Sequence, residues 1–382
     1  MVSAALPAPA LADYSIIPLP VYATSRNSGD DMGFMPVLLL KEQNEYVYGI
    51  VAPSVIYNRN SGYNITFRYL GFPSIEKNYR IFINRSTGID QEYTGEYWDT
   101  KFLGGKCRLY TKATFFSDST YRFFGLTERS RDKKETNYTD TEFAPEVNLG
   151  YYLPNHFVVS LGERFRWVDI NRGRAGSLPF TGSRFPKLQG IKGGSVLAHR
   201  LSLSYDTRDD EVYPSAGVFA NVYGELGSEF SEGRFFSKTG FEAKKYISFK
   251  DKRFTTVVKT SFQLTAGNKV PFYEESWIGG ENTLRGLGNF RFRDDAYILF
   301  NVEERIRLFK MHIFDVTSDW ELAPFVDTGR VFSSFRKEFT GHWQVNPGVG
   351  FRAIVPPNIV GRVDFGFGIE GLNAFVGLDF PF

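Results

Sequence analysis

Cysteine, histidine and long hydrophobic runs are scarce in this sequence. Cys107 is the single cysteine among 382 residues, so an internal disulfide is excluded. No apolar run reaches the roughly 18 residues that a membrane-spanning helix needs, and the mean hydropathy is −0.26. The 45 basic and 43 acidic residues leave a net charge of +2, so charge gives no support to a nucleic-acid partner. These absences exclude a helical membrane protein and a disulfide scaffold.

Aromatic residues and alternating segments are abundant instead. Phe and Tyr number 38 and 21, and aromatic residues make up 17% of the chain, as expected for a lipid-facing wall with interfacial girdles. Apolar and polar residues alternate in several segments, which predicts strands with one apolar face. Because an arginine that faces lipid at mid-bilayer costs about 2–4 kcal/mol, the charged faces are expected to point inward. The clearest segments are 216–226, 254–264, 296–305 and 362–369.

The connections between the expected strands alternate between short and long. The short ones include 153–156, 250–252 and 356–358, and the long ones are 128–140, 168–196 and 267–294. Short periplasmic turns and longer outer loops are the rule for outer-membrane barrels. The pattern predicts an all-β fold, a transmembrane antiparallel β-barrel of 16 strands with 18 as the alternative count. A soluble β-sandwich is the second interpretation, and it does not explain the loop lengths.

Three segments are expected along the chain. Residues 1–12 resemble the remnant of a signal peptide, because Ala10-Leu11-Ala12 resembles a signal-peptidase site. The charged and apolar regions that normally precede such a site are missing, so a tail of small residues is the alternative. Residues 13–32 are too short for a domain and are expected at the mouth or inside the lumen. Residues 33–382 are predicted to form the transmembrane β-barrel.

The carboxy-terminal segment 374–382 has one unbroken apolar face at a period of two residues. Within it, Gly377, Phe380 and Phe382 resemble the terminal signal by which outer-membrane barrels are recognised for insertion. The segment is therefore predicted to be the closing strand of the barrel.

The seam that closes the barrel is expected to be weak. Pro36 in the expected first strand and Pro381 in the last strand both lack a backbone donor. A pairing between segments 33–40 and 371–382 would therefore be thinly hydrogen-bonded. Such a seam would thin the bilayer or open laterally.

Three motifs of the C-terminal half, together with this ending, resemble one family. A charged turn carries Asp206, Arg208, Asp209, Pro214 and Gly217. The stretch Gly279-Gly280-Glu281-Asn282-Thr283-Leu284-Arg285-Gly286 lies in a long loop, and successive strands then carry Asn301-Val302-Glu303-Glu304-Arg305 and Phe325-Val326-Asp327-Thr328-Gly329. These motifs, in this order, resemble the BamA/TamA-type outer-membrane assembly-factor superfamily, also called the bacterial surface antigen family. The resemblance is most secure over residues 197–382.

The resemblance implies that the long loop folds back into the lumen. Its tip, here Arg285-Gly286, would meet Asp327 beside the wall acid that matches Glu303. The alternation agrees, because both acids fall on inward faces and a guanidinium binds carboxylates bidentately. Leu287 departs from the family, in which an aromatic residue follows the Arg-Gly pair; this bears on the packing of the tip and not on the ion pair. We favour a lock for the loop over a direct role in handling substrate, and a register-setting turn for the motif at 206–217.

Family members that insert or secrete proteins carry periplasmic polypeptide-transport-associated modules before the barrel. No segment before residue 33 is long enough to form one. The sequence therefore resembles a barrel-only member located in the bacterial outer membrane, and insertase or translocase activity does not follow from the resemblance alone. The expected partners are outer-membrane lipids, with a separate periplasmic receptor protein and a homo-oligomer as further options.

Three functions are compatible with a chain of this kind to different degrees. The first is a barrel that resembles assembly and translocation factors and assists the insertion or transport of proteins or lipids. The second is a passive or plugged channel, or a structural barrel. The third is an enzyme, which we do not expect, because none of the 4 histidines stands beside a serine or aspartate in a catalytic arrangement. Zinc and phosphate motifs are absent from the sequence, so no cofactor or metal is expected. The histidines are His156, His199, His312 and His342.

Overall fold

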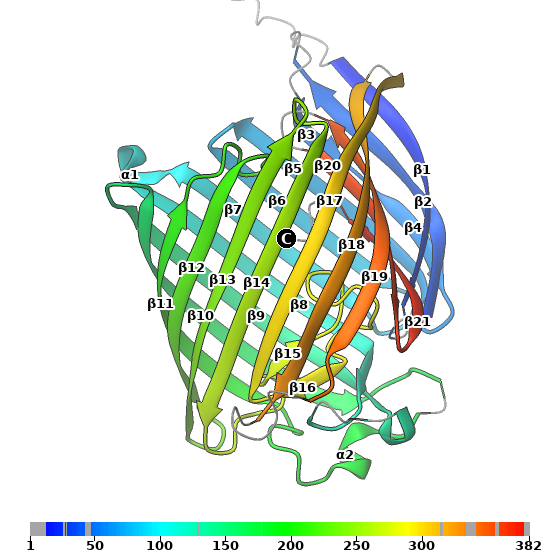
Figure 1. Cartoon of the computed structure of the whole chain (residues 1–382). Coiled ribbons are helices and arrows are strands. Elements are labelled where there is room, and N and C mark those ends of the chain that lie inside the picture. Colours follow the sequence, from blue (N-terminus) through cyan, green and yellow to red (C-terminus); the bar gives the residue numbers. More distant parts are fainter. Residues whose placement is uncertain are drawn as a thin grey trace, which may run out of the picture.

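The chain forms a closed antiparallel β-barrel (Figure 1). This computed structural model describes residues 13–25, 27, 29–42, 47–127, 130, 132–176, 178–313, 316–333, 341–355 and 359–377. The wall is a 19-stranded sheet in which β3 and β4 both pair with β2 and β5, so these two form one interrupted strand. Counted in this way the barrel has 18 strands, the alternative count predicted from the sequence.

The strands keep one order around the wall. Each pairs with its neighbours in the sequence, except where the connection between β14 and β17 intervenes. The wall strands are β1 (Asp13–Ser25), β2 (Gly29–Lys41), β3 (Val47–Val51), β4 (Ser54–Asn58), β5 (Gly62–Ser74), β6 (Lys77–Ser86), β7 (Gln91–Lys101), β8 (Cys107–Phe123), β9 (Thr136–Tyr152), β10 (Phe157–Arg172), β11 (Gly194–Asp206), β12 (Gly217–Glu229), β13 (Arg234–Phe249), β14 (Phe254–Gly267), β17 (Ala296–Ile313), β18 (Val316–Phe332), β19 (Gln344–Val355), β20 (Ile359–Gly368) and β21 (Gly371–Gly377).

The first wall strand begins earlier than expected. β1 pairs with β2 from Asp13 opposite Lys41 to Ser25 opposite Gly29, so residues 13–25 belong to the wall and not to the mouth or lumen. The barrel boundary predicted at residue 33 is therefore wrong. The prolines at 18 and 20 hid this strand, because proline in a strand is confined to edges, first positions and bulges.

Two prolines, Pro18 on β1 and Pro36 on β2, explain two weak points of the wall. Pro18 lies directly opposite Pro36, and two residues without N–H groups can face each other only as a non-hydrogen-bonded pair. The backbone nitrogen of Pro18, which carries no hydrogen to donate, therefore points away from β2 and toward the seam with β21. On β2, Phe34 pairs with Val55 and Leu38 with Val51, so Pro36 stands opposite the break between β3 and β4.

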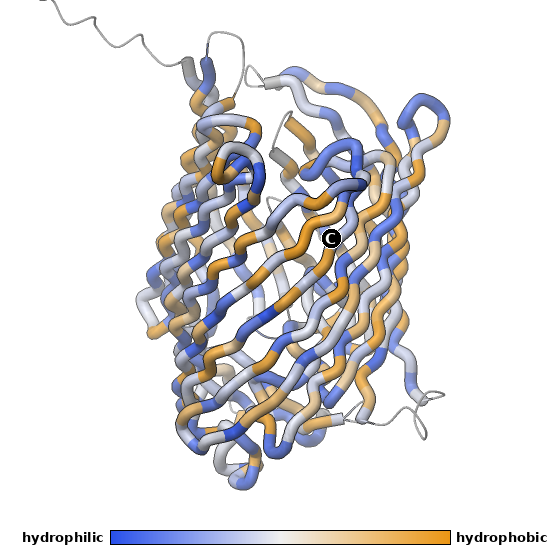
Figure 2. The backbone as a smooth tube through the Cα atoms, turned by 90° about the vertical axis from the view of Figure 1, so that its left-hand side faces the viewer, coloured by the Kyte–Doolittle hydropathy of each residue, from blue (hydrophilic) through white to orange (hydrophobic). Residues whose placement is uncertain are grey.

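The two faces of the wall differ in polarity as the alternation predicted. On β12, the side chain of Val222 is 54% exposed on the outer face, whereas Glu225 on the inner face is 2% exposed. On β18, Val326 is 45% exposed and the adjacent Asp327 is 0% exposed. Figure 2 shows hydrophilic and hydrophobic residues alternating along the strands. The inward charges are thus kept away from the acyl chains.

Long and short connections gather at opposite ends of the barrel (Figure 1). One end, here called the long-connection end, carries residues 124–135, 173–193 and 268–295. The other, the short-turn end, carries the turns at 153–156 and 250–253. The described helical turns are the single turns α1 (Phe102–Gly105), α2 (Thr181–Arg184) and η1 (Asp132–Lys134). Among the described residues, the helices are all too short and too polar to cross a bilayer.

The barrel closes through a very short seam. β21 pairs with β20 from Arg362 opposite Gly377 to Gly368 opposite Gly371, whereas among the described residues its pairing with β1 is limited to Thr24 opposite Ala374. The predicted thin seam is thus present, with β1 rather than segment 33–40 as its second strand. Pro381, Phe380 and Phe382 lie outside the described residues, whereas Gly377 ends β21.

The lipid face generates a first prediction. We expect Val222→Arg to lower the free energy of unfolding by about 2–4 kcal/mol, because Val222 points outward near the middle of β12. Val345→Arg makes the same change at the second residue of β19, at the long-connection end, where the cost falls to about 0–1 kcal/mol. Urea unfolding in phospholipid vesicles measures both values. Equal destabilisation by the two substitutions would contradict a depth-dependent lipid face.

Candidate functional site

The connection between β14 and β17, residues 268–295, contacts inward-facing side chains of the wall. It contains a small hairpin of β15 (Ser276–Ile278) and β16 (Phe292–Asp294), which pair with each other and not with the wall (Figure 1). Two of the charged residues that anchor it are Glu274 and Arg285, and both side chains are buried. The contacts of these two residues define the candidate site.

Arg285 is held by the carboxylates predicted for it. Its Nε and Nη2 atoms donate to Oδ2 and Oδ1 of Asp327 at 2.8 and 2.9 Å, a bidentate pair. Its Nη1 atom donates to Oε2 of Glu303 at 2.7 Å. The ring of Phe325 lies 3.3 Å from the guanidinium carbon and completes the enclosure as a cation–π contact. The structure therefore brings Arg285, Asp327 and Glu303 together.

A wider cluster of charges surrounds this triad. Asp364 of β20 lies 3.5 Å from Nη1 of Arg285 and 2.8 Å from Nη2 of Arg352. Arg352 also contacts Glu303 at 3.1 Å. Because buried charges are costly unless paired, the close balance of arginines and acids is what allows the cluster to exist inside the barrel. The ion pairs among the described residues define the inner-wall cluster as Arg285, Arg305, Arg352, Arg362, Glu281, Glu303, Asp327 and Asp364.

Sequence reasoning found part of this cluster. Asp364 was visible as an inward residue of segment 362–369, but nothing in the sequence linked it to Arg285. Phe325 was visible within the strand motif, and its role as the aromatic partner of Arg285 was missed. Leu287, where the family has an aromatic residue, is fully buried in an apolar cluster with Leu284 and neighbouring residues.

Gly286 permits the close approach of the tip to the wall. A Cβ atom at this position would lie 2.5 Å from the carbonyl oxygen of Phe367 and 2.6 Å from Nδ2 of Asn346. The wall offers matching space, because a Cβ at Gly366 would lie 2.3 Å from the carbonyl oxygen of Arg285. Backbone therefore packs on backbone, and any larger residue would push the tip away.

The tip also bridges the two sides of the seam. Nδ2 of Asn373 on β21 donates to the carbonyl of Gly286 at 3.0 Å, and Glu370 accepts the N–H of Gly288 at 2.7 Å. On the other side, Nδ2 of Asn27, between β1 and β2, donates to the carbonyl of Asn289 at 3.2 Å. The connection thus joins strands that the wall itself joins by one residue pair.

A second anchor lies on a separate part of the wall. The Glu274 carboxylate accepts hydrogen bonds from Arg164 at 2.7 and 3.1 Å, from Arg166 at 3.2 Å and from Lys238 at 2.6 Å. Glu225 offsets this excess of cations through an ion pair of 2.6 Å with Arg164. Sequence reasoning missed Glu274, because its partners lie on β10 and β13 and only the folded barrel brings them together.

The charged turn at residues 206–217, at the short-turn end, contacts the inner-wall cluster around Arg285. Asp206 binds the guanidinium of Arg208 at 2.6 Å. The carbonyl of Pro214 accepts a hydrogen bond of 3.4 Å from Arg305, which in turn contacts Glu303 at 3.2 Å. The turn motif is therefore connected to the partners of Arg285 through a single wall residue.

Asp209 and Gly217 shape this turn. Partial burial of the Asp209 carboxylate opposes its ionisation, but hydrogen bonds from Ser215 and from the N–H of Ala216 outweigh burial and hold the pKa of Asp209 well below its ordinary value. Gly217 has a φ of +102°, and a Cβ there would lie 2.2 Å from the carbonyl oxygen of Thr207. The turn thus requires a carboxylate at 209 and a glycine at 217.

The described residues contain no cluster of His, Cys, Asp and Glu that would hold a metal ion. The Nδ1 atom of His199 lies 2.6 Å from Oε2 of Glu163, and both side chains are substantially exposed on the outer face. His312 contacts the hydroxyl of Thr317 at 3.0 Å. His156 packs edge-on against Tyr205, and His342 is exposed.

The buried pair generates a second prediction. We expect Asp327→Ala to destabilise the connection by about 3–5 kcal/mol, because Arg285 loses its bidentate partner while it stays buried. The measurement is the rate of external proteolysis within residues 268–295 in the folded barrel. Asn282→Ala is the control, since Asn282 is an exposed residue of the same connection outside the ion-pair cluster, and the change should leave protease resistance close to that of the native chain. Unchanged resistance of the Asp327 variant would count against the lock.

Both the sequence and the fold of this chain resemble those of known proteins. The family model described as the Omp85 superfamily domain matches residues 77–371, well over half of the chain. A search of curated proteins found no match.

Two solved structures resemble the chain in fold. BamA from Haemophilus ducreyi lacking POTRA domains 1–3 matches with a TM-score of 0.54 and 14% identity, over 94% of this chain and 74% of that one. CdiB from Escherichia coli matches with a TM-score of 0.55 and 10% identity, over 96% of this chain and 60% of that one. The barrel, its inner connection and the family match together show that this chain is an outer-membrane β-barrel that belongs to the Omp85 superfamily.

Proposed function

We propose that this barrel assists the insertion or transport of proteins or lipids at the outer membrane by opening between β1 and β21. The membership supports an assembly or translocation type of barrel. The single observation that carries the finer proposal is the seam, in which Thr24 and Ala374 form the one residue pair between the described parts of the two strands. A wall that separates at this place loses fewer ladder contacts than at any other described strand pair.

Polar space lies directly behind the seam. Two cavities of about 570 and 760 Å³ are both lined by Val21 of β1 and Val376 of β21. Charged side chains that include Arg68, Glu92 and Lys112 line the same cavities. Opening of the seam would therefore join a polar interior to the bilayer, which is the passage that a polar segment of a substrate needs.

The tip of the connection would control this opening. It holds Asn27 on one side of the seam and Asn373 on the other, and Arg285 fixes the tip to β17 and β18. Release of Arg285 would remove the bridge and leave the single wall pair. We therefore propose that the ion pairs of Arg285 hold the seam closed in addition to holding the connection in place.

A disulfide across the seam tests the proposal. Thr24→Cys/Ala374→Cys, in a Cys107→Ala background, links the two strands at their one direct pair. We expect the reduced form in liposomes to accelerate the folding of a second, urea-denatured outer-membrane barrel, and the oxidised form to lose the acceleration. Heat-modifiable gel mobility of the second barrel reports its folding rate.

A matched disulfide separates the seam from general stiffening. Val222→Cys/Phe241→Cys in the same background links a directly opposite outward pair of β12 and β13, and it should be equally active in both redox states. Acceleration by the oxidised seam form equal to that of its reduced form would refute lateral opening. Absence of acceleration by the native chain would remove the assembly role itself.

A plugged channel is the second candidate function. The observation in its favour is that the connection is anchored on two separate parts of the wall, by Glu274 to β10 and β13 and by Arg285 to β17 and β18. In that case the connection would block a pore rather than control a seam.

Conductance in planar bilayers tests the plug. We expect the double variant Glu274→Gln/Arg285→Ala to conduct severalfold more than the native chain, because both anchors of the connection are weakened together. Each single change should have a smaller effect, because the remaining anchor still restrains the connection. Asn282→Ala, at an exposed residue of the connection, serves as the control. Unchanged conductance of the double variant would exclude the connection as a plug.

A further inference from the structure

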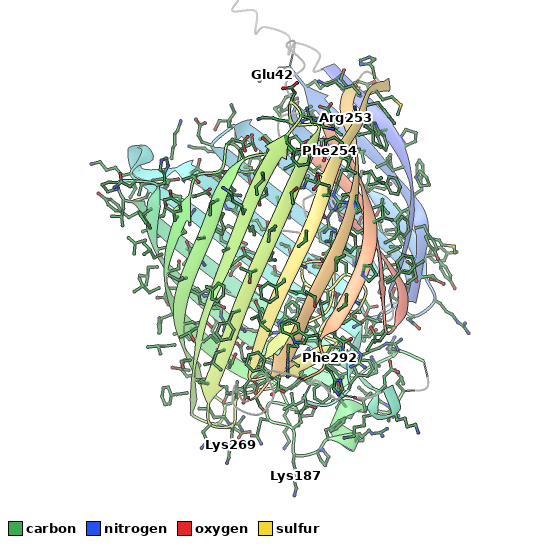
Figure 3. All side chains as sticks on the ribbon, in the orientation of Figure 1. Glu42, Lys187, Arg253, Phe254, Lys269 and Phe292 are labelled. Carbon is green, nitrogen blue, oxygen red and sulfur yellow. The ribbon has the colours of Figure 1, made fainter. Side chains whose placement is uncertain are left out.

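A surface rich in cations covers part of the long-connection end. No aspartate or glutamate occurs in the sequence from Asn171 to Tyr205. The basic residues from Arg172 to Lys192 and those of the neighbouring turn η1 are exposed, and Figure 3 shows Lys187 pointing away from the barrel at this end. The surface, here called the basic rim, consists of Lys133, Lys134, Arg172, Arg174, Arg184, Lys187 and Lys192.

The basic rim is carried by a fixed segment and not by a loose loop. Phe180, Phe185, Leu188 and Ile191 pack onto the apolar cluster around Phe272 at this end of the barrel. Hydrogen bonds also tie the segment to its surroundings. The N–H of Ala175 donates to Oδ1 of Asn137 at 3.0 Å, and the N–H of Phe272 donates to the carbonyl of Gln189 at 2.9 Å. Apolar residues thus face the barrel while the cations between them face away.

The cations are not neutralised by the protein. Throughout the described part of the chain, no carboxylate lies within ion-pair distance of any member of the basic rim. Arg184 donates to the carbonyl of Lys133 at 2.7 Å, which joins the two segments of the rim without cancelling their charge. Positive charges held close together in this way attract a ligand with several negative charges.

The position of the rim identifies the source of that charge. Trp167 and Phe143 are directly opposite each other on β10 and β9, and both are exposed on the outer face. Phe235 on β13 is 74% exposed at the same end. Outward aromatic residues mark the membrane–water interface, and Arg172 follows Trp167 on the same strand, beyond that level. The rim therefore lies beyond these aromatic residues, on the side of the lipid headgroups rather than of the acyl chains.

We propose that the basic rim binds the phosphate groups of phosphorylated lipid headgroups in the adjacent leaflet. Guanidinium and ammonium groups are the usual partners of phosphate, the guanidinium through its planar fork and the ammonium as a point charge. Clusters of Lys and Arg next to a membrane-embedded surface bind anionic lipids through these contacts. The binding surface is separate from the seam and from the inner-wall cluster, so the proposal does not depend on the function proposed above.

The test compares two triple variants of the full chain that remove equal charge. Arg174→Gln/Lys187→Gln/Lys192→Gln alters the basic rim, and Lys106→Gln/Lys245→Gln/Lys250→Gln alters exposed lysines toward the short-turn end. Each folded barrel in detergent is titrated with lipid A that carries two phosphates, and native mass spectrometry measures the bound fraction. We expect the rim variant to bind on the order of tenfold to a hundredfold more weakly and the control variant to bind like the native chain.

Further arms identify the source of the phosphate. Lipid A without phosphate should bind equally to the native chain and to both variants, and high salt should weaken only the phosphorylated lipid. Unchanged lipid A binding by the rim variant, or equal weakening in both variants, would overturn the proposal. Tight binding of soluble polyphosphate that is lost in the rim variant while lipid A binding persists would also overturn it. If the triple variant does not fold, Lys187→Gln alone must still weaken lipid A binding.

Discussion

The closure of this barrel depends on contacts made from inside it. Outer-membrane strands must satisfy their backbone groups within the wall, yet β1 and β21 share one residue pair in the part of the chain that the structure describes. The tip of the β14–β17 connection supplies what the wall lacks, because it binds Asn27 beside β1 and Asn373 on β21. The geometry of the tip, and Gly286 above all, therefore decides whether the cylinder is closed. The seam and the lock are parts of one arrangement.

Opposite charges hold the two ends of the connection in place. Glu274 is an acid that sits among cations of the wall, and Arg285 is a cation that sits among acids. Each residue would be repelled at the other site, so the connection fits the barrel in one orientation. Because buried ion pairs lose much of their attraction to desolvation, their value here is specificity of position rather than stability. The cost of a misplaced connection is what keeps it in place.

The sequence was sufficient for the fold and for part of the site. Alternation in segments such as 216–226 predicted inward charges, because the lipid face tolerates none. It failed at β1, where Pro18 and Pro20 interrupt the strand signal at positions that only an edge strand tolerates. The triad of Arg285 followed from family resemblance. Glu274 did not, because no local pattern records which distant strands a loop residue will meet.

The prolines of β1 have a consequence for any strand that pairs with this edge. Pro18 faces the seam without an N–H group, and Pro20 follows it at the same period of two residues. A guest strand would therefore find acceptors at these positions but no donors, and its ladder would be interrupted. An edge of this kind favours brief pairing followed by departure. If the barrel acts as proposed, its first strand would therefore favour turnover of a guest strand over lasting fusion with it.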